Sequence, residues 1–142
     1  FFGIVAVGFT YFVQSGFFSR DALLAGLAVG LVVNNLLVVN NYREMEEDCQ
    51  SDKKTLAVRF GRKFSLWQFR LQTLVSCVCV AWMPTMDFRV WLLLFVILCL
   101  LGVRVSNQLD NAVTTKDFGV CLNTTALMVP VFGTILGIGI LT

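Results

Sequence analysis

Long apolar runs alternate with short polar segments along the whole chain. Residues 22–42, 90–103 and 118–142 contain no Asp, Glu, Lys or Arg, and Arg70 is the one charge within residues 64–86. A helix that crosses a bilayer needs roughly 20 apolar residues. The pattern therefore predicts an all-α, multi-pass transmembrane bundle of about five helices, at residues 1–13, 21–48, 65–84, 89–106 and 118–141. The first run is short and starts abruptly, which is typical of a helix that begins upstream.

The composition narrows the chemistry that these residues can perform. Hydrophobic residues make up 57% of the chain and charged residues 14%, with a mean hydropathy of +0.79, whereas soluble domains carry about 25% charged residues. The chain has no His, which excludes Ser-His-Asp catalysis and His-ligated metal sites within it, and its five Cys show no zinc-binding spacing. Carboxylates are the remaining strong metal ligands, and oxygen ligands suit hard cations such as Mg²⁺.

The distribution of cations predicts the orientation. The loops near residues 14–21 and 84–89 lie on one side of the predicted bundle and carry two cations, whereas segments 43–70 and 104–116 lie on the other side and carry nine. Lys and Arg accumulate on the cytoplasmic side of membrane proteins. We therefore expect a cell (inner) membrane protein whose residues 43–70 face the cytosol. The same cations suit anionic lipid headgroups, and the net charge of +2 gives no indication of a nucleic-acid partner.

A polar stripe follows the predicted helix at residues 21–48. Asn34, Asn41, Glu44 and Asp48 fall within about 80° of one another when each residue advances the helix by about 100°. Glu44 and Asp48 are one turn apart on one face. Asn34 and Asn35 lie inside the apolar run, where an unsatisfied amide is costly, so we expect both to face the bundle interior.

The end of this stripe allows a metal–diphosphate site at the membrane surface. Two carboxylates one turn apart repel each other, and a divalent cation would reverse the sign of that interaction. Mg²⁺ typically binds one or two carboxylates together with substrate phosphates and water, and Lys53, Lys54 and Arg59 follow closely enough to meet phosphate oxygens. The same spacing also allows an ordinary helix end, because charges crowd the ends of most membrane helices.

Two segments carry a resemblance to a known family. Residues 38–61, VVNNYREMEEDCQSDKKTLAVRFG, resemble the second acidic motif of the UbiA superfamily of intramembrane prenyltransferases, which in its naphthoate branch is roughly N-N-x-R-D-x-x-x-D-x-x-x-G-K-x-T-L-A-V-R-x-G. The opening FFGIVAVGFTYFVQSG is similar to another stretch of that branch. The resemblance covers residues 1–63 in two motifs, and the later helices agree in pattern alone. The matching positions of the acidic motif are Asn40, Asn41, Arg43, Asp48, Lys53, Thr55, Leu56, Ala57, Val58, Arg59 and Gly61.

Two positions and one whole motif depart from the family pattern. Glu44 stands where the family usually has Asp, and Asp52 stands where it usually has Gly. Both changes bear on metal geometry, because Mg²⁺ requires nearly ideal octahedral placement of its ligands. The family's first acidic motif, N-D-x-x-D-x-x-x-D, is absent from these residues. Since family members have nine helices, the resemblance implies that residues 1–142 are the C-terminal part of a single prenyltransferase domain, which we expect to be inactive alone.

The resemblance also implies a reaction. A polyprenyl group would move from its diphosphate to 1,4-dihydroxy-2-naphthoate, with loss of the carboxyl group, in menaquinone biosynthesis, and Mg²⁺ would help the diphosphate leave. The isoprenoid tail of the polyprenyl diphosphate would lie in an apolar groove between helices. Ion pairs with Glu46 or Glu47 would explain the presence of Arg43, Lys53 and Arg59 about as well as phosphate binding does. The resemblance implies that Glu44 and Asp48 are the catalytic metal carboxylates and that Asn41 is an orienting amide. It also implies that Arg43, Lys53 and Arg59 are phosphate contacts or loop anchors.

Other classes of protein stay open at this point. Another UbiA-type aromatic prenyltransferase, of the quinone or vitamin-K type, would share the acidic motif. A transporter or channel module, suggested by Asn34 and Asn35, would carry solute across vesicles and tolerate changes to the loop carboxylates. A structural membrane subunit without chemistry is favoured by the missing first motif.

Overall fold

The computed structural model describes residues 2–84 and 86–141, and over these residues the chain is helical, with no strand. Four of the helices are long and apolar enough to cross a membrane: α2, α4, α5 and α6. The all-α, multi-pass architecture is therefore confirmed. The helices in chain order are α1 (Ile4–Ser15), α2 (Arg20–Arg43), α3 (Met45–Gln50), α4 (Leu56–Ala81), α5 (Phe88–Asp110) and α6 (Thr115–Leu141).

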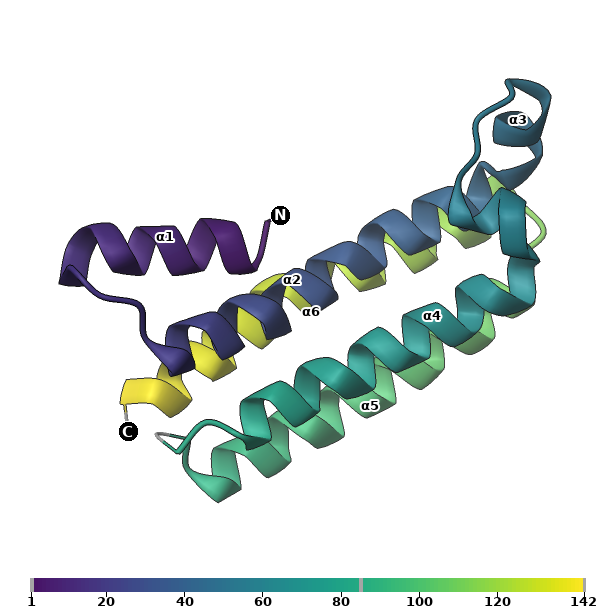
Figure 1. Cartoon of the computed structure of the whole chain (residues 1–142). Helices are drawn as coiled ribbons and strands as arrows, with labels where there is room; N and C mark the ends of the chain where they lie inside the picture. The colour runs from purple at the N-terminus through teal and green to yellow at the C-terminus, as the bar shows by residue number, and fades with distance from the viewer. Residues whose placement is uncertain (1, 85, 142) are drawn as a thin grey trace.

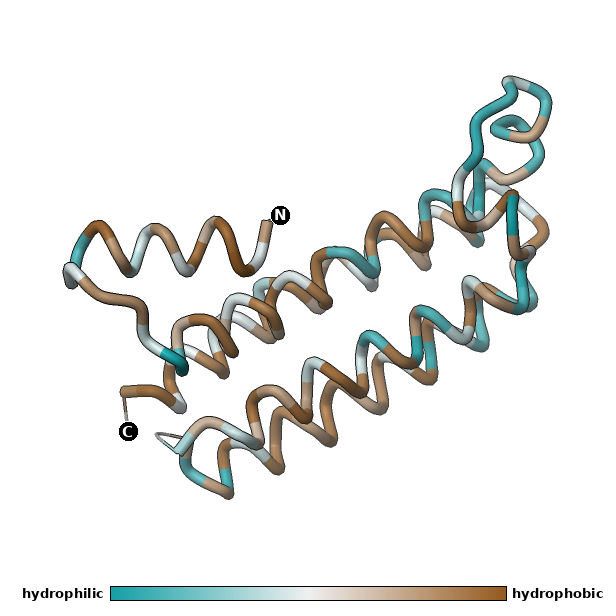
Figure 2. The backbone as a smooth tube through the Cα atoms, in the orientation of Figure 1, coloured by the Kyte–Doolittle hydropathy of each residue, from teal (hydrophilic) through white to brown (hydrophobic). Residues whose placement is uncertain are grey.

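The four long helices form one bundle (Figure 1). Each packs on two neighbours, in the order α2, α4, α5, α6 and back to α2. The α3 segment and the α5–α6 link lie at one end of the bundle, whereas the α1–α2 link, the α4–α5 turn and the C-terminus lie at the other. Figure 2 shows that hydrophilic residues gather at the α3 end and that apolar residues dominate the helices between the ends. This arrangement agrees with the two sides that the sequence predicts.

Apolar side chains fill the interior of the bundle and also cover its outside. Val32, Phe69, Leu98 and Phe132 come from the four long helices, and each is at most 1% exposed. Other large apolar side chains point outward, including Leu100, which is 67% exposed. Large apolar side chains exposed along all the long helices are typical of helices that face lipid on one side and a packed interior on the other.

The predicted helix at residues 21–48 is wrong as a single element. It breaks at Glu44, whose backbone has φ −88° and ψ 6°, so that α2 ends at Arg43 and α3 begins at Met45. The break places Glu46, Glu47 and Asp48 in the first turn of α3, where carboxylates interact favourably with the helix dipole. The backbone N–H of Asp48 still donates to the carbonyl of Glu44 over 2.8 Å, so the two residues stay one turn apart.

Helix α4 begins at Leu56, well before the predicted start at residue 65. The hydroxyl of Thr55 caps it by accepting a hydrogen bond from the N–H of Val58 over 3.3 Å. Gly61, with φ 82° and ψ 175°, then kinks the helix. The cations of residues 59–63 argue against a membrane interior but not against a helix, which is why the charge pattern alone predicts the start too late.

Three glycines let α1 approach α2 closely. A Cβ atom on Gly3 would lie 2.2 Å from the carbonyl oxygen of Gly26, and one on Gly30 would lie 2.9 Å from the Cα of Gly3. Gly26 and Gly30 have the GxxxG spacing that allows close backbone packing between membrane helices. Gly133 and Gly137 in α6 have the same spacing, yet a Cβ on either would meet nothing within 4 Å.

Candidate functional site

The α2–α3 junction holds the first candidate carboxylate. Glu44 accepts a hydrogen bond from Asn40 Nδ2 over 2.9 Å through its Oε2 atom, and its Oε1 atom accepts one from the Arg43 guanidinium. Arg43 also donates to Asn40 Oδ1 over 2.9 Å. The three side chains therefore form a closed set in which both Glu44 oxygens have partners. The motif match alone predicts no role for Asn40, but its place four residues before Glu44 puts the two on one helix face and is the sequence signal for this contact.

The second candidate carboxylate is buried. Asp48 is 3% exposed, and its Oδ1 atom accepts a hydrogen bond from Lys53 Nζ over 3.0 Å. Its backbone carbonyl also accepts from the Lys53 N–H over 3.0 Å. The hydrogen bond to the Asp48 carboxylate, followed by its charge, raises the pKa of the Lys53 ammonium. Lys53 therefore neutralises Asp48 and holds the loop that follows α3.

The backbone conformation at Asp52 explains why the family usually has Gly at this position. Its φ is +55°, the only positive φ of a non-glycine residue in the described part of the chain. This left-handed conformation favours Gly, and Asp tolerates it better than most other residues. The loop thus keeps a backbone geometry suited to Gly while adding a carboxylate next to Lys53.

The other cations contact different groups. Arg62 donates to Glu46 Oε1 over 2.9 Å and lies over the ring of Tyr42, which connects α4 to α3 and α2. The predicted alternative, pairing with Glu46, thus applies to Arg62 rather than to the three proposed phosphate contacts. Arg59 is exposed, stacks over the Phe60 ring and lines a recess of about 400 Å³ with Lys54. The structure does not bring Arg59 to either carboxylate.

Two cavities open along the polar stripe of α2. The larger, about 600 Å³, is mostly apolar, and Asn34 and Asn40 are its amides. The smaller, about 80 Å³, lies between α2 and α4, and its polar residues include Asn34, Asn41 and Gln68. Neither cavity is lined by Glu44 or Asp48. Asn40 nevertheless lines the larger cavity and binds Glu44, which places that carboxylate at its edge. The residues of the larger cavity come from α1, its preceding segment, α2 and Leu122.

Asn35 lies in the bundle interior, as the sequence predicts. It is fully buried and donates from Nδ2 to the hydroxyl of Thr73 on α4 over 3.0 Å. Its Oδ1 atom has no hydrogen-bond partner. Thr73 donates in turn to the carbonyl of Phe69 over 2.9 Å. This contact fixes α2 against α4 directly behind Asn34, which is half-buried and faces both cavities.

The donor chemistry at the α2–α3 junction suits a hard cation. Glu44, Asp48 and the Asn40 amide supply oxygen atoms, and Mg²⁺ in proteins is commonly held by one or two carboxylates with phosphates and water completing the shell. In the described part of the chain, no three Asp, Glu, Cys or His side chains gather as a metal-ligand group. These residues thus offer part of a coordination shell, in which each carboxylate is balanced by a cation of the chain itself.

Together, the fold and the site define a multi-pass membrane protein with a carboxylate–cation cluster beside an apolar cavity. The chain belongs to the UbiA prenyltransferase family, whose family model matches residues 1–137. This agrees with the resemblance in the acidic motif and extends it to the later helices.

Individual relatives match a shorter part of the chain. It is similar to the 1,4-dihydroxy-2-naphthoate octaprenyltransferases of Haemophilus influenzae, with 39% identity over 61 residues (43% of this chain, 20% of the relative), and of Mycobacterium leprae, with 41% identity over 61 residues (43% and 21%). It is also similar to UbiA prenyltransferase domain-containing protein 1 of Gallus gallus, with 41% identity over 64 residues (45% and 19%). The aligned stretch spans about a fifth of each relative. No solved structure gives a significant match.

Proposed function

We propose that this chain forms part of an enzyme that transfers a polyprenyl group from its diphosphate to 1,4-dihydroxy-2-naphthoate, with loss of the carboxyl group, in menaquinone biosynthesis. The observation that carries the proposal is the cluster around Glu44 and Asp48, which lies where the polar stripe of α2 leaves the apolar cavity. The names of the two bacterial relatives, 1,4-dihydroxy-2-naphthoate octaprenyltransferases, support the choice of acceptor.

The two ends of a polyprenyl diphosphate fit the two parts of this site. The isoprenoid tail is too apolar for water, and the cavity beside α2 offers it a mostly apolar lining. The diphosphate head is an anion, and the α2–α3 junction carries Arg43, which contacts Asn40 of the cavity lining, and Lys53, which binds Asp48. We therefore place the head at the α2–α3 junction and the tail toward α1.

The charges of the site suggest an exchange of partners on substrate binding. Arg43 and Lys53 now neutralise Glu44 and Asp48. Mg²⁺, when bound by these carboxylates, would supply the positive charge that stabilises a departing diphosphate. Both cations would then be free to donate to phosphate oxygens, where charge-assisted hydrogen bonds are strong. Asn40 would keep Glu44 oriented throughout, because its amide contacts both Glu44 and Arg43.

The bond changes are those of an aromatic substitution with decarboxylation. The allylic C–O bond breaks and its electron pair leaves with the diphosphate. A ring carbon of the acceptor uses its π electrons to form the new C–C bond. The bond between the ring and the carboxylate then breaks, its electron pair restores the aromatic ring, and carbon dioxide leaves. Further ligands for the head and the acceptor would come from parts of the protein outside these residues, since the aligned stretch covers about a fifth of each relative.

The test is turnover of a polyprenyl diphosphate by the full-length protein in membranes. We expect Glu44→Gln and Asp48→Asn each to lower the rate about a hundredfold or more, as loss of an electrostatic group in an active site commonly does. Glu47→Gln is the matched control, because Glu47 is an exposed acid of the same short helix and should leave turnover unchanged. If both site variants kept the rate of the parent while remaining folded, as judged by circular dichroism, the proposal would be wrong.

A different aromatic acceptor is the second candidate. The relatives from Gallus gallus and Xenopus tropicalis carry another name, UbiA prenyltransferase domain-containing protein 1. An acceptor series that includes dihydroxynaphthoate, a naphthoquinol without the carboxyl group and a hydroxybenzoate separates the two. If only dihydroxynaphthoate is prenylated and carbon dioxide is released, dihydroxynaphthoate is the acceptor. A preference for an acceptor without a carboxyl group supports the second candidate.

A further inference from the structure

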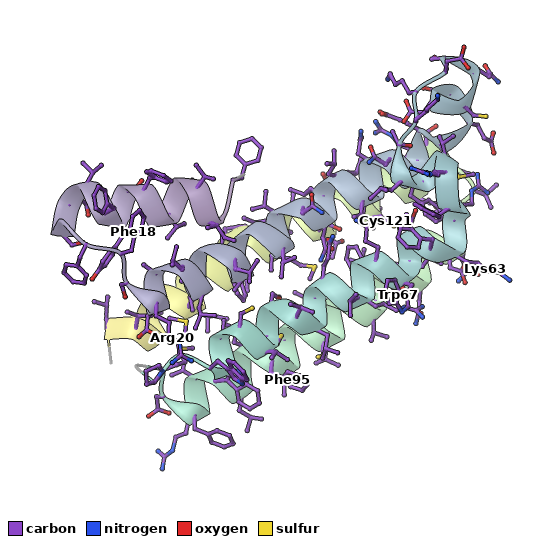
Figure 3. The ribbon with its side chains drawn as sticks, viewed as in Figure 1. Phe18, Arg20, Lys63, Trp67, Phe95 and Cys121 are labelled. Carbon is purple, nitrogen blue, oxygen red and sulfur yellow. The ribbon has the colours of Figure 1, made fainter. Side chains whose placement is uncertain are left out.

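The outer face of α4 changes character partway along its length. Lys63, Trp67 and Arg70 follow one another at helical spacing and are all exposed, and the same stripe continues into the exposed apolar residues Leu74 and Val78. Trp67 is 57% exposed, and Figure 3 shows it on α4 close to Lys63, which lies near the kinked end of the helix. A stripe that passes from cation and aromatic ring to aliphatic side chains marks the boundary between headgroups and hydrocarbon.

Helix α5 changes in the same way at the same level. Its exposed face carries Leu100 and Val103 and then Arg104. The Arg70 Nε atom donates to the hydroxyl of Ser106 over 2.7 Å. The change from polar to apolar residues on α4 therefore lies at the same height in the bundle as the change on α5. The seven steps from Lys63 to Arg70 rise about 10 Å along the axis, which is enough to span the headgroup layer of one leaflet.

The cations on this face have no acidic partner. Lys63, Arg70 and Arg104 make no ion pair within the described part of the chain, where the ion pairs join Arg43 to Glu44, Lys53 to Asp48 and Arg62 to Glu46. Asp110 of α5 interacts electrostatically with Tyr42, on the α2 side of the bundle. Among the described residues, the three cations of this face therefore have no ion-pair partner.

Aromatic rings complete the same face. Phe64 and Trp67 have ring centroids 6.0 Å apart, and Phe60 continues the series at 4.9 Å from Phe64. Trp and Tyr are the aromatic residues usually enriched at membrane interfaces, because their rings combine an apolar body with a polar edge. Cations beside such rings are positioned to meet phosphate oxygens while the ring rests among the upper acyl chains.

We propose that this basic–aromatic face, formed by Lys63, Trp67, Arg70 and Arg104, binds the headgroups of anionic phospholipids. The phosphodiester would accept hydrogen bonds from Lys63 and Arg104. Arg70 would contribute the guanidinium nitrogens that Ser106 does not use, and Trp67 would pack on the glycerol region. Each cation near an anionic membrane surface contributes attraction that weakens with salt. The inference does not depend on the prenyl-transfer reaction.

Fluorescence of Trp67 tests the proposal directly. The full chain is reconstituted into vesicles that contain equal fractions of phosphatidylglycerol and phosphatidylcholine, with one of the two brominated near the glycerol backbone. The Trp67 signal is the difference between the chain and its Trp67→Phe variant. We expect brominated phosphatidylglycerol to quench Trp67 about twofold or more beyond brominated phosphatidylcholine, and the preference to fall as salt rises.

Three variants distinguish lipid binding by this face from general attraction between the cations of the chain and an anionic membrane. Lys63→Gln and Arg104→Gln should each reduce the preference, and their combination should abolish it. Lys116→Gln removes the same charge from the exposed start of α6 and should leave it intact. Equal quenching by both lipids in the parent chain, or an equal loss in the Lys116 variant, would overturn the proposal. Circular dichroism confirms that each variant is folded, so that a lost preference reports on the surface itself.

Discussion

At the scale of single residues, the two candidate metal-binding carboxylates form ion pairs with cations of the same chain. Asp48 is buried and bound by Lys53, and Glu44 is bound by Arg43 and Asn40. The contact with Asp48 raises the pKa of Lys53. A raised ammonium pKa means that the contact stabilises the fold below the ordinary lysine pKa and is lost only as the pH rises through the raised value. The Lys53–Asp48 contact is therefore present at neutral pH.

Lys53 should compete with a divalent cation for Asp48. We expect Lys53→Met to bind Mn²⁺, used as a spectroscopic substitute for Mg²⁺, several-fold more tightly than the parent chain when no diphosphate is present. Lys54→Met is the control, because Lys54 is the adjacent exposed cation and makes no ion pair with a described residue. Electron paramagnetic resonance of free Mn²⁺ measures both. An equal change in the two variants would show that Lys53 acts through general charge and not through its contact.

At the scale of elements, two backbone irregularities shape the site. The break at Glu44 separates α3 from α2, and the kink at Gly61 turns the first residues of α4 toward α3. The Arg62–Glu46 ion pair joins the two helices just beyond the kink. The loop between them is held from one side by Lys53 and from the other by the Thr55 cap. The site thus depends on a short helix held between two longer ones.

Gly61 should be the residue that tolerates substitution least in this region. Its φ of 82° with ψ of 175° is open to Gly and strained for any other residue, and such strain costs about 1–3 kcal/mol. We expect Gly61→Ala to lower the thermal midpoint in detergent by several degrees. Gly119→Ala is the matched control, because Gly119 is helical with open space around it, and Ala is the better helix former. Equal midpoints for the two variants would contradict the assigned backbone conformation.

At the scale of the whole molecule, the bundle has two chemically different ends. The α3 end carries the acidic motif and most of the cations, whereas the other end carries the α1–α2 link and the α4–α5 turn. The excess of Lys and Arg predicts that the α3 end faces the cytosol. Cys49 lies at that end and is the one exposed cysteine of the five, since the others are buried or half-buried.

Labelling of Cys49 tests this orientation. A membrane-impermeant maleimide should modify Cys49 in inside-out vesicles and leave it unmodified in right-side-out vesicles or intact cells. The converse probe is Ser19→Cys in a Cys49→Ser background, because Ser19 precedes α2 at the opposite end and its side chain makes no capping bond. It should be labelled from the outside alone. The opposite pattern for the pair would reverse the proposed orientation.

The amino-acid sequence by itself determined the class of protein, the four long membrane helices and the acidic motif. Span length and local motifs depend on neighbouring residues, so they can be read without a structure. It also placed Asn35 in the interior, because an amide in an apolar run must find a partner inside the bundle. The predicted helix through residue 48 failed because the acidic side chains favour a new helix start over continuation.

The tertiary structure alone decided which groups meet. The Asn35–Thr73 and Arg70–Ser106 hydrogen bonds join residues 38 and 36 positions apart, and the Arg62–Glu46 pair spans 16 positions. Such contacts depend on how helices pack, as do the glycine contact of α1 with α2 and the cavity beside it. Many cation–carboxylate pairings have similar energies along the chain. Packing, not charge pattern, therefore selects Lys53 for Asp48 and leaves Lys63 facing outward.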